Sequence, residues 1–255
     1  MAEAVSFLRP RASNPATNPP VDDVVRANIA VKRTNALELL HAIAAEHGGV
    51  DGQVTFANSF GAEDMVLTDL ILAERLPIEI FSLDTGRLPA ETYTLMGEVE
   101  KRYGAKLKVF FPDAGAVEAY VRSEGINAFY ESVELRKRCC GIRKVEPLKR
   151  ALTGKLAWIT GMRAAQSATR VDLPVRQFDE GNGLEKYNPL SDWSEQEVWA
   201  YIRIHGLPYN ALHDQFYPSI GCAPCTRPIA VGEDVRAGRW WWEDPANKEC
   251  GLHKK

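Results

Sequence analysis

The apolar positions of the chain follow a helical period near the N-terminus and then gather into short runs. Between residues 21 and 47 they recur at the spacing of an amphipathic helix, which Gly48-Gly49 would end. Four apolar runs typical of buried strands follow, and each is separated from the next by a stretch with helical period. The runs cover 53–58, 78–83, 107–111 and 155–160, and the helical stretches cover 62–75, 90–103, 114–124 and 141–152.

Strands that alternate with helices in this way predict an α/β fold. The expected architecture is a doubly wound, mostly parallel sheet with helices on both faces. The carboxyl ends of the strands of such a sheet lie along one edge, and ligands bind there. We therefore expect segments 59–64, 84–88 and 161–170 to lie on one rim.

The regular alternation ends after residue 170. We expect 171–188 to be a loop with a short strand at 184–187, and Ser194 with Glu197 fits a capping box that opens a helix ending near Gly206. Beyond this helix the chain is rich in Pro, Gly and aromatic residues. The predicted organisation is a disordered tail at 1–20, an α/β domain at 21–206 and a C-terminal extension at 207–255 that ends in a mobile tail.

The composition narrows the possible functions. A net charge of −3 argues against a general binder of nucleic acid or membrane surfaces, because such proteins usually carry a basic excess. No apolar run approaches the roughly 20 residues of a membrane-spanning helix, and the start of the chain lacks a segment typical of a signal peptide. We therefore expect a cytoplasmic protein without nucleic-acid or membrane partners. The sequence is compatible with a homo-oligomer but does not fix the number of subunits.

The cysteines carry the clearest chemical signal. All five fall in the second half of the chain, as the adjacent pair Cys139-Cys140, a CxxC motif at Cys222 and Cys225, and Cys250 near the end. A CxxC motif alone fits a redox dithiol, a zinc half-site or an iron–sulfur half-site. Adjacent cysteines are unusual at structural zinc, whereas neighbouring thiolates can reach different irons of a cubane cluster. The spacing therefore favours iron–sulfur and leaves zinc open.

Three further features point to an anionic ligand. Residues 59–64 lie between a predicted strand and helix, where backbone N–H groups can receive an anion, although a plain Ser/Gly connection gives the same pattern. Arg163 and Arg170 follow another strand and suit a phosphate-like group. Seven of the fifteen residues 136–150 are basic, which is typical either of a solvated helix face or of a charged site around the first cysteine pair.

The cysteine-containing segments resemble those of a known family. The segments at 137–148 (KRCCGIRKVEPL), 221–227 (GCAPCTR) and 248–253 (KECGLH) are similar to the signature blocks of the thioredoxin-dependent adenylylsulfate (APS) reductases. The three blocks stand in the family's order, and the likeness runs from about residue 27 to the end. The related 3′-phospho-APS (PAPS) reductases share the last block but typically lack the paired cysteines, so the resemblance favours the unphosphorylated substrate.

The resemblance implies a role for particular residues. It implies a [4Fe–4S] cluster held by Cys139, Cys140, Cys222 and Cys225, and a catalytic nucleophile at Cys250. It also implies that residues 59–64 form a modified phosphate loop, in which Phe60 replaces a second glycine. The substrate-binding residues that it implies are Ser59, Gly61, Leu83, Lys144, Gly161, Arg170, Arg236, Arg239 and His253.

The family reading also implies a mechanism and a partner. The Cys250 thiolate would attack the sulfur of APS, AMP would leave, and thioredoxin would release sulfite from the S-sulfonated cysteine. The cluster would act as an electrostatic and structural element. A PAPS reductase or an enzyme of dual specificity is the nearest alternative. A metal-binding redox regulator that uses the basic run to contact DNA is a more remote one, because it has no use for Cys250.

Overall fold

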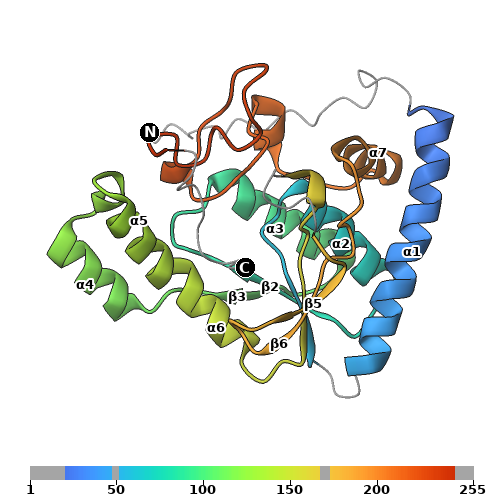
Figure 1. The fold of residues 1–255 in the computed structure, drawn as a ribbon, viewed down its shortest axis with the longest axis horizontal. Helices are drawn as coiled ribbons and strands as arrows, with labels where there is room; N and C mark the ends of the chain where they lie inside the picture. Colours follow the sequence, from blue (N-terminus) through green and yellow to red (C-terminus); the bar gives the residue numbers. More distant parts are fainter. Residues whose placement is uncertain (1–20, 48–51, 167–172, 245–255) are drawn as a thin grey trace, which may run out of the picture.

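The fold is a mixed α/β structure around one six-stranded sheet, seen here in a computed structural model that describes residues 21–47, 52–166 and 173–244 (Figure 1). The strand order is β3-β2-β1-β4-β6-β5. All neighbours are parallel except β5 and β6, which pair antiparallel. The strands are β1 (Val54–Ala57), β2 (Glu79–Leu83), β3 (Lys108–Phe110), β4 (Ala157–Ile159), β5 (Arg176–Asp179) and β6 (Leu184–Tyr187). The α-helices are α1 (Asp23–His47), α2 (Ala62–Ala73), α3 (Ala90–Tyr103), α4 (Ala114–Glu124), α5 (Val133–Cys140), α6 (Glu146–Leu152) and α7 (Glu195–His205).

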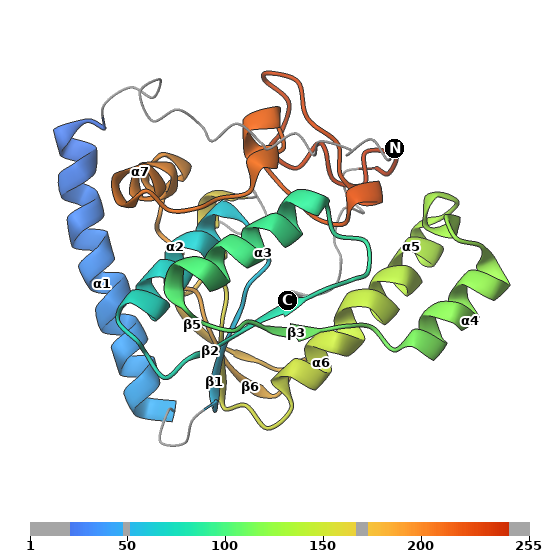
Figure 2. The same ribbon diagram turned by 180° about the vertical axis from the view of Figure 1, so that it is seen from behind.

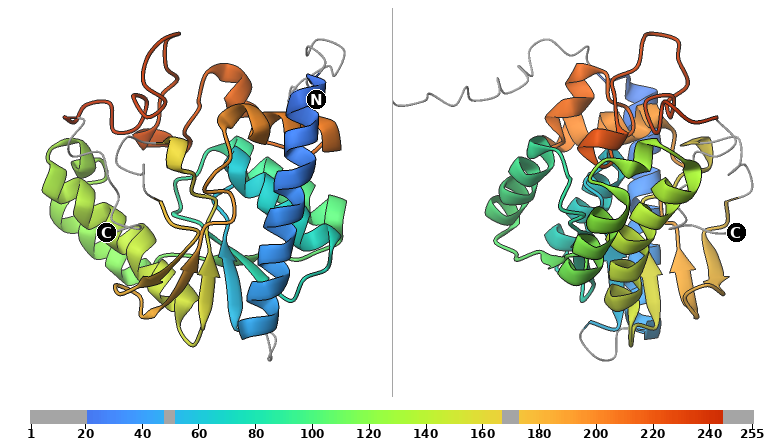
Figure 3. Two further views of the ribbon diagram at one scale, coloured as in Figure 1. Left: turned by 45° about the vertical axis from the view of Figure 1, so that its right-hand side comes forward. Right: turned by 90° about the vertical axis from the view of Figure 1, so that its left-hand side faces the viewer.

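Helices cover both faces of the sheet, as the doubly wound prediction requires (Figures 1 and 2). Alternate strand residues point to opposite faces, so Phe56 and Ile159 pack with α1, α2 and α7, whereas Phe81 and Trp158 pack with α6. Figure 3 shows α1 and the α4–α6 group on different sides of the sheet. The central strands are therefore buried on both faces, which explains their nearly continuous apolar runs.

Most of the predicted elements are confirmed. The helix predicted at 90–103 and the strand predicted at 184–187 have the predicted bounds, and the other central strands differ by one or two residues at their ends. The capping box is also present: Glu197 N–H donates to Ser194 Oγ over 3.2 Å, and Ser194 N–H donates to Glu197 Oε2 over 2.8 Å. This helix ends at Gly206, which adopts the left-handed conformation that favours glycine (φ 56°).

The prediction of one helix at 141–152 was wrong in its start and its regularity. A helix begins already at Val133, where the Ser132 hydroxyl accepts a hydrogen bond from Leu135 N–H over 3.1 Å. It passes through a π-helical turn at Gly141–Val145 before α6. The basic residues hid the apolar face of α5 from a periodicity reading, and the wider turn is a local feature that often marks functional sites.

The segment predicted as a loop at 171–188 contains a second strand, β5. It pairs with β6 from Arg176–Tyr187 to Asp179–Leu184, and Gly183 has φ 71° in the connection. Its Arg-Gln-Phe-Asp sequence has little apolar character because it is an edge strand with one exposed side. Within the described residues, no helix is both long enough and apolar enough to span a lipid bilayer.

Candidate functional site

A large cavity opens at the carboxyl ends of the parallel strands, on the rim that the sequence predicts. Its volume is about 740 Å³. The loop after β1, the end of β2 and the segment after β4 form one side, and residues 216–240 of the C-terminal extension form another. The extension, drawn in orange to red in Figure 1, therefore closes the open end of the sheet.

The cavity brings together most of the predicted substrate-binding residues. Those among its lining residues are Ser59, Gly61, Leu83, Lys144, Gly161, Arg236 and Arg239. They come from segments up to 180 residues apart, so only the fold makes them neighbours. Arg170, His253 and Cys250 lie outside the described residues.

The loop between β1 and α2 binds one of its own carboxyl groups. Asp64 Oδ2 accepts hydrogen bonds from Ser59 N–H over 2.6 Å and from the Ser59 hydroxyl over 2.7 Å. Phe60 N–H donates to Asn58 Oδ1 over 2.7 Å. The first two backbone N–H groups of the loop, which we expected to receive an anion, therefore already have partners inside the loop.

Phe60 adopts a backbone conformation that favours glycine. Its φ is 62°, in the left-handed region that costs a non-glycine residue about 1 kcal/mol. The ring is 1% exposed and packs against Met65, Leu95 and Val99 under α3. Burial of an aromatic ring offsets the backbone cost, so Phe60 anchors the loop to the core instead of lining the cavity.

Asp64 is a buried acid at the wall of the cavity. Burial raises its pKa to about 7, although the hydrogen bonds from Ser59 oppose the shift. The carboxyl group also lies against Gly161, where an added Cβ would come within 2.2 Å of Asp64 Oδ1. Gly161 is therefore needed for the close approach of these two segments.

The raised pKa of Asp64 predicts a pH-dependent stability. Between about pH 4 and pH 7 the folded chain holds a proton that the unfolded chain releases, so stability falls as pH rises through this range. The free energy of unfolding of the unmodified chain should therefore fall by on the order of 2–3 kcal/mol between pH 5 and pH 8, and this fall should be absent in Asp64→Asn. Urea unfolding of both proteins at the two pH values measures this. A stability difference that does not change with pH would contradict the assignment.

Arg163, which the sequence suggested as an anion ligand, is engaged by a neighbouring acid. Its Nε donates to Glu63 Oε1 over 2.7 Å, and its guanidinium also reaches the Trp193 carbonyl over 3.3 Å. Arg163 is 5% exposed. A buried, paired arginine contributes less net positive charge to the cavity than an unpaired one.

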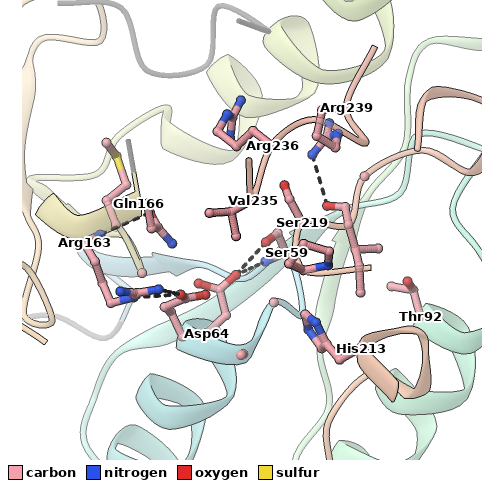
Figure 4. Close-up of a pocket in the computed structure, with 18 of the residues that line it drawn as sticks. Ser59, Asp64, Thr92, Arg163, Gln166, His213, Ser219, Val235, Arg236 and Arg239 are labelled. Carbon is pink, nitrogen blue, oxygen red and sulfur yellow. Dashed lines mark hydrogen bonds and ion pairs between the residues drawn. The ribbon is translucent and has the colours of Figure 1, made fainter. Parts of the chain in front are cut away.

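Two of the positive groups that line the cavity lie on the side of the C-terminal extension. Arg236 and Arg239 belong to this segment, and Figure 4 shows them above Ser59 and Asp64. Arg236 N–H donates to Asp234 Oδ1 over 2.8 Å, and Arg239 donates to the Ile220 carbonyl over 3.3 Å. Asp64 and these two arginines thus lie on different sides of the cavity.

A second, smaller cavity lies beside the first and is lined by all four cysteines of the two predicted pairs. The apolar cluster around it contains Phe129 and Trp240 with the thiols Cys139, Cys140, Cys222 and Cys225, all of which are free of disulfides. Arg87, Arg136 and Arg143 also line this cavity. Lys144 lines both cavities and therefore stands between them.

The charges around the four thiols act on them unequally. Burial alone would raise the pKa of Cys222, but Lys144, the Thr85 hydroxyl at 3.2 Å and nearby arginines outweigh it and lower the pKa. Burial, followed by the neighbouring thiols Cys222 and Cys140, raises the pKa of Cys225 to about 12. The surroundings thus favour the thiolate form at Cys222 and disfavour it at Cys225.

Two buried donors lie in the same region as the cysteines. The indole N–H groups of Trp240 and Trp242, which pack in the cysteine cluster, have no hydrogen-bond partner among the described residues. Within the same residues, no group of three or more His, Cys, Asp or Glu side chains is arranged to hold a metal ion. The thiols instead surround a shared space.

Some residues of the two cavities were not singled out from the sequence. Glu63 and Asp64 were read as part of a loop, and Arg87 and Thr85 as part of a turn, without a role of their own. A buried carboxylate early in the apolar helix α2 was the available signal for Asp64. Nothing in the sequence indicates the Glu63–Arg163 pair, because the two residues are 100 positions apart.

The sheet order and the strand-end cavity define an α/β protein of the adenine nucleotide alpha hydrolase-like fold. A solved PAPS reductase from Candida auris, in a phosphate complex, has a TM-score of 0.65 and 26% identity, and the match covers 82% of this chain and 99% of that one.

The sequence comparisons identify the family. Residues 53–228 match the phosphoadenosine phosphosulfate reductase domain, and the chain belongs to this family. The adenosine 5′-phosphosulfate reductase of Allochromatium vinosum is 58% identical, with 89% of this chain and 87% of that protein covered. The one of Neisseria meningitidis serogroup A is 52% identical, with 92% and 96% covered.

Proposed function

We propose that this chain reduces adenylylsulfate to sulfite and AMP in assimilatory sulfate reduction. The observation that carries the proposal is Lys144, which lines both the strand-end cavity and the four-cysteine cavity. A nucleotide with an acidic phosphosulfate needs cations at one end of its cavity, and Lys144, Arg236 and Arg239 supply them. Relatives at 58% and 52% identity are named for the same activity.

The residues of the smaller cavity fit a [4Fe–4S] cluster. Four thiols from two pairs offer one ligand for each iron, and the buried indole N–H groups of Trp240 and Trp242, which lack a partner among the described residues, pack in the apolar cluster that contains these thiols. Cys139, Cys140, Cys222 and Cys225 would hold the cluster. When bound, it would supply a fixed charge beside the cavity and tie the two cysteine pairs together.

The chemistry would take place at Cys250. Its thiolate would attack the sulfur of APS, a sulfur–sulfur bond would form, and the sulfur–oxygen bond would break with its electron pair going to AMP. A thioredoxin thiolate would then attack Cys250 Sγ, release sulfite and leave a mixed disulfide that its second thiol resolves. Lys144, Arg236 and Arg239 would reduce the repulsion between the Cys250 thiolate and the anionic phosphosulfate.

The electrostatics of the large cavity also favour the unphosphorylated nucleotide. Lys144, Arg236 and Arg239 are assigned to the phosphosulfate and Arg163 is paired with Glu63, so a second phosphate would have to compete for cations that already have a partner. The chain thus supports a preference for APS over PAPS.

Inhibition and turnover test the proposed substrate. We expect AMP to compete with APS, and we expect a 3′-phosphate on the nucleotide to weaken binding by about ten-fold or more, because a phosphate that leaves water without a cation to pair with costs at least about 1.4 kcal/mol. Steady-state assays with thioredoxin on APS and PAPS measure both effects. Equal or better turnover of PAPS would overturn the preference, and no turnover of either nucleotide would overturn the function.

A further inference from the structure

Arg136 forms a buried ion pair that connects the first cysteine pair to the end of the described chain. It lies on α5, three residues before Cys139, and is 0% exposed. Its guanidinium donates two hydrogen bonds to Glu243 in a bidentate arrangement, from Nε to Oε1 over 2.9 Å and from a terminal nitrogen to Oε2 over 2.6 Å. Side-chain exposure of Glu243 is 3%. A buried ion pair with two parallel hydrogen bonds holds both side chains in one geometry.

The same guanidinium lies against the ring of Trp240. The Arg136 Cζ is 4.7 Å from the ring centroid, and the Arg239 Cζ is also 4.7 Å from it. Trp240 is 1% exposed and has φ 42°, a backbone conformation that is strained for a residue other than glycine. Such strain persists where the surrounding packing fixes the residue in place. One buried ring therefore contacts both arginines.

These contacts run from one cavity to the other. Arg136 lines the cavity of the four cysteines, and Arg239 and Trp240 line the large cavity. The backbone N–H of Trp240 donates to the Cys225 carbonyl over 3.2 Å, which ties the backbone at Trp240 to the CxxC motif. Arg239 in turn lies close against Gly221, where an added Cβ would meet its guanidinium at 2.3 Å. Arg239 is thus held from both sides.

We infer that Arg136 is a positioning residue for substrate binding. Fixed by Glu243, it supports the Trp240 ring, and the ring sets the place of the Arg239 guanidinium at the cavity. The inference rests on the proposed function, in which Arg239 binds the phosphosulfate of APS. It assigns to α5 a second task besides carrying cysteines, and it assigns to Glu243 the task of orienting Arg239 through Arg136 and Trp240.

The contacts require an arginine at position 136. A planar guanidinium can pair with a carboxylate through two parallel hydrogen bonds and stack on an aromatic face at once, whereas a lysine ammonium is a point charge that cannot do both. Arg136→Lys therefore preserves the charge and removes the geometry. Arg138→Lys is the matched control, because Arg138 lies on the same helix and likewise meets a carboxylate, Glu124, and an aromatic ring, Tyr120, but lines neither cavity.

The test measures equilibrium binding of APS to proteins that also carry Cys250→Ser, so that the ligand stays intact. We expect Arg136→Lys to weaken APS binding by about ten-fold and Arg138→Lys by less than about two-fold. AMP binding should change less than APS binding, because Arg239 is assigned to the phosphosulfate. Iron content and thermal midpoint are measured on every variant, and Glu243→Gln provides a milder change if Arg136→Lys does not fold.

A double-mutant cycle separates positioning from general damage. In an Arg239→Lys background, Arg136→Lys should cause little further loss of APS affinity, since the two residues act in series. Additive losses, equal losses of AMP and APS affinity, or an Arg136→Lys protein that binds APS like the Arg138→Lys control would each overturn the inference. Turnover of APS by the unmodified chain tests the proposed function separately. A failure of the positioning role of Arg136 can therefore be distinguished from a failure of the proposed function.

Discussion

Cys250→Ser is expected to abolish the release of AMP and sulfite from APS while APS still binds. The reason is that a serine hydroxyl is ionised far less than a cysteine thiol at neutral pH and is a weak nucleophile without a base. The cations Lys144, Arg236 and Arg239 remain in the cavity of this variant, so they still hold the nucleotide. Rates of AMP release with thioredoxin, together with the binding constant for APS, measure both halves of the expectation.

A chain truncated after Glu249 is the companion to this variant. It lacks the thiol and the remaining tail but keeps every residue of the described cavities, so it should bind APS and release neither product. Sulfite made by the truncated chain would show that Cys250 is not the nucleophile. A Cys250→Ser protein that lost APS affinity would instead show that the side chain has a binding role.

The second large effect is expected for the four cysteines of the smaller cavity. Protein purified without oxygen should be brown and hold about four irons and four acid-labile sulfides per chain. Replacing Cys139, Cys140, Cys222 or Cys225 by serine should cause most of this iron to be lost, because each thiolate supplies the ligand of one iron. Iron, zinc and labile-sulfide analysis of each purified variant gives the answer.

Cys250→Ser is the control for these four variants, and it should keep its full iron content. Zinc in place of iron, with no labile sulfide, would contradict the cluster and favour the zinc site that the CxxC motif alone also allows. A Cys250→Ser protein without iron would show that the five cysteines are divided wrongly between cluster and chemistry.

Much of the fold could be predicted because its signals are local. The strand at 184–187 and the helix at 90–103 have the expected bounds, and the helix ends at Gly104, whose φ of 64° suits a glycine cap. Helix α5 was missed because three consecutive basic residues interrupt the spacing of its apolar ones. Strand β5 was missed because an edge strand needs little apolar surface and its pairing is set by β6.

The sequence identified many residues that line the two cavities, but not the acidic residues that pair with the buried arginines. The likeness of three short blocks to a family was enough to select seven residues that line one cavity and four that line another. It did not indicate that Arg163 is bound by Glu63 or that Arg136 is bound by Glu243. These pairs join residues about 100 positions apart, and no local pattern marks such contacts.

The central claim, that sulfur transfer takes place at Cys250, is tested most directly by mass spectrometry of a single turnover. The protein is mixed with APS in the absence of thioredoxin, and the C-terminal peptide and the released nucleotide are quantified. We expect one sulfonate on the peptide that contains Cys250 and one AMP released per chain, with free sulfite only after thioredoxin is added. Free sulfite without a covalent adduct, or a sulfonate on Cys222 or Cys225, would contradict it.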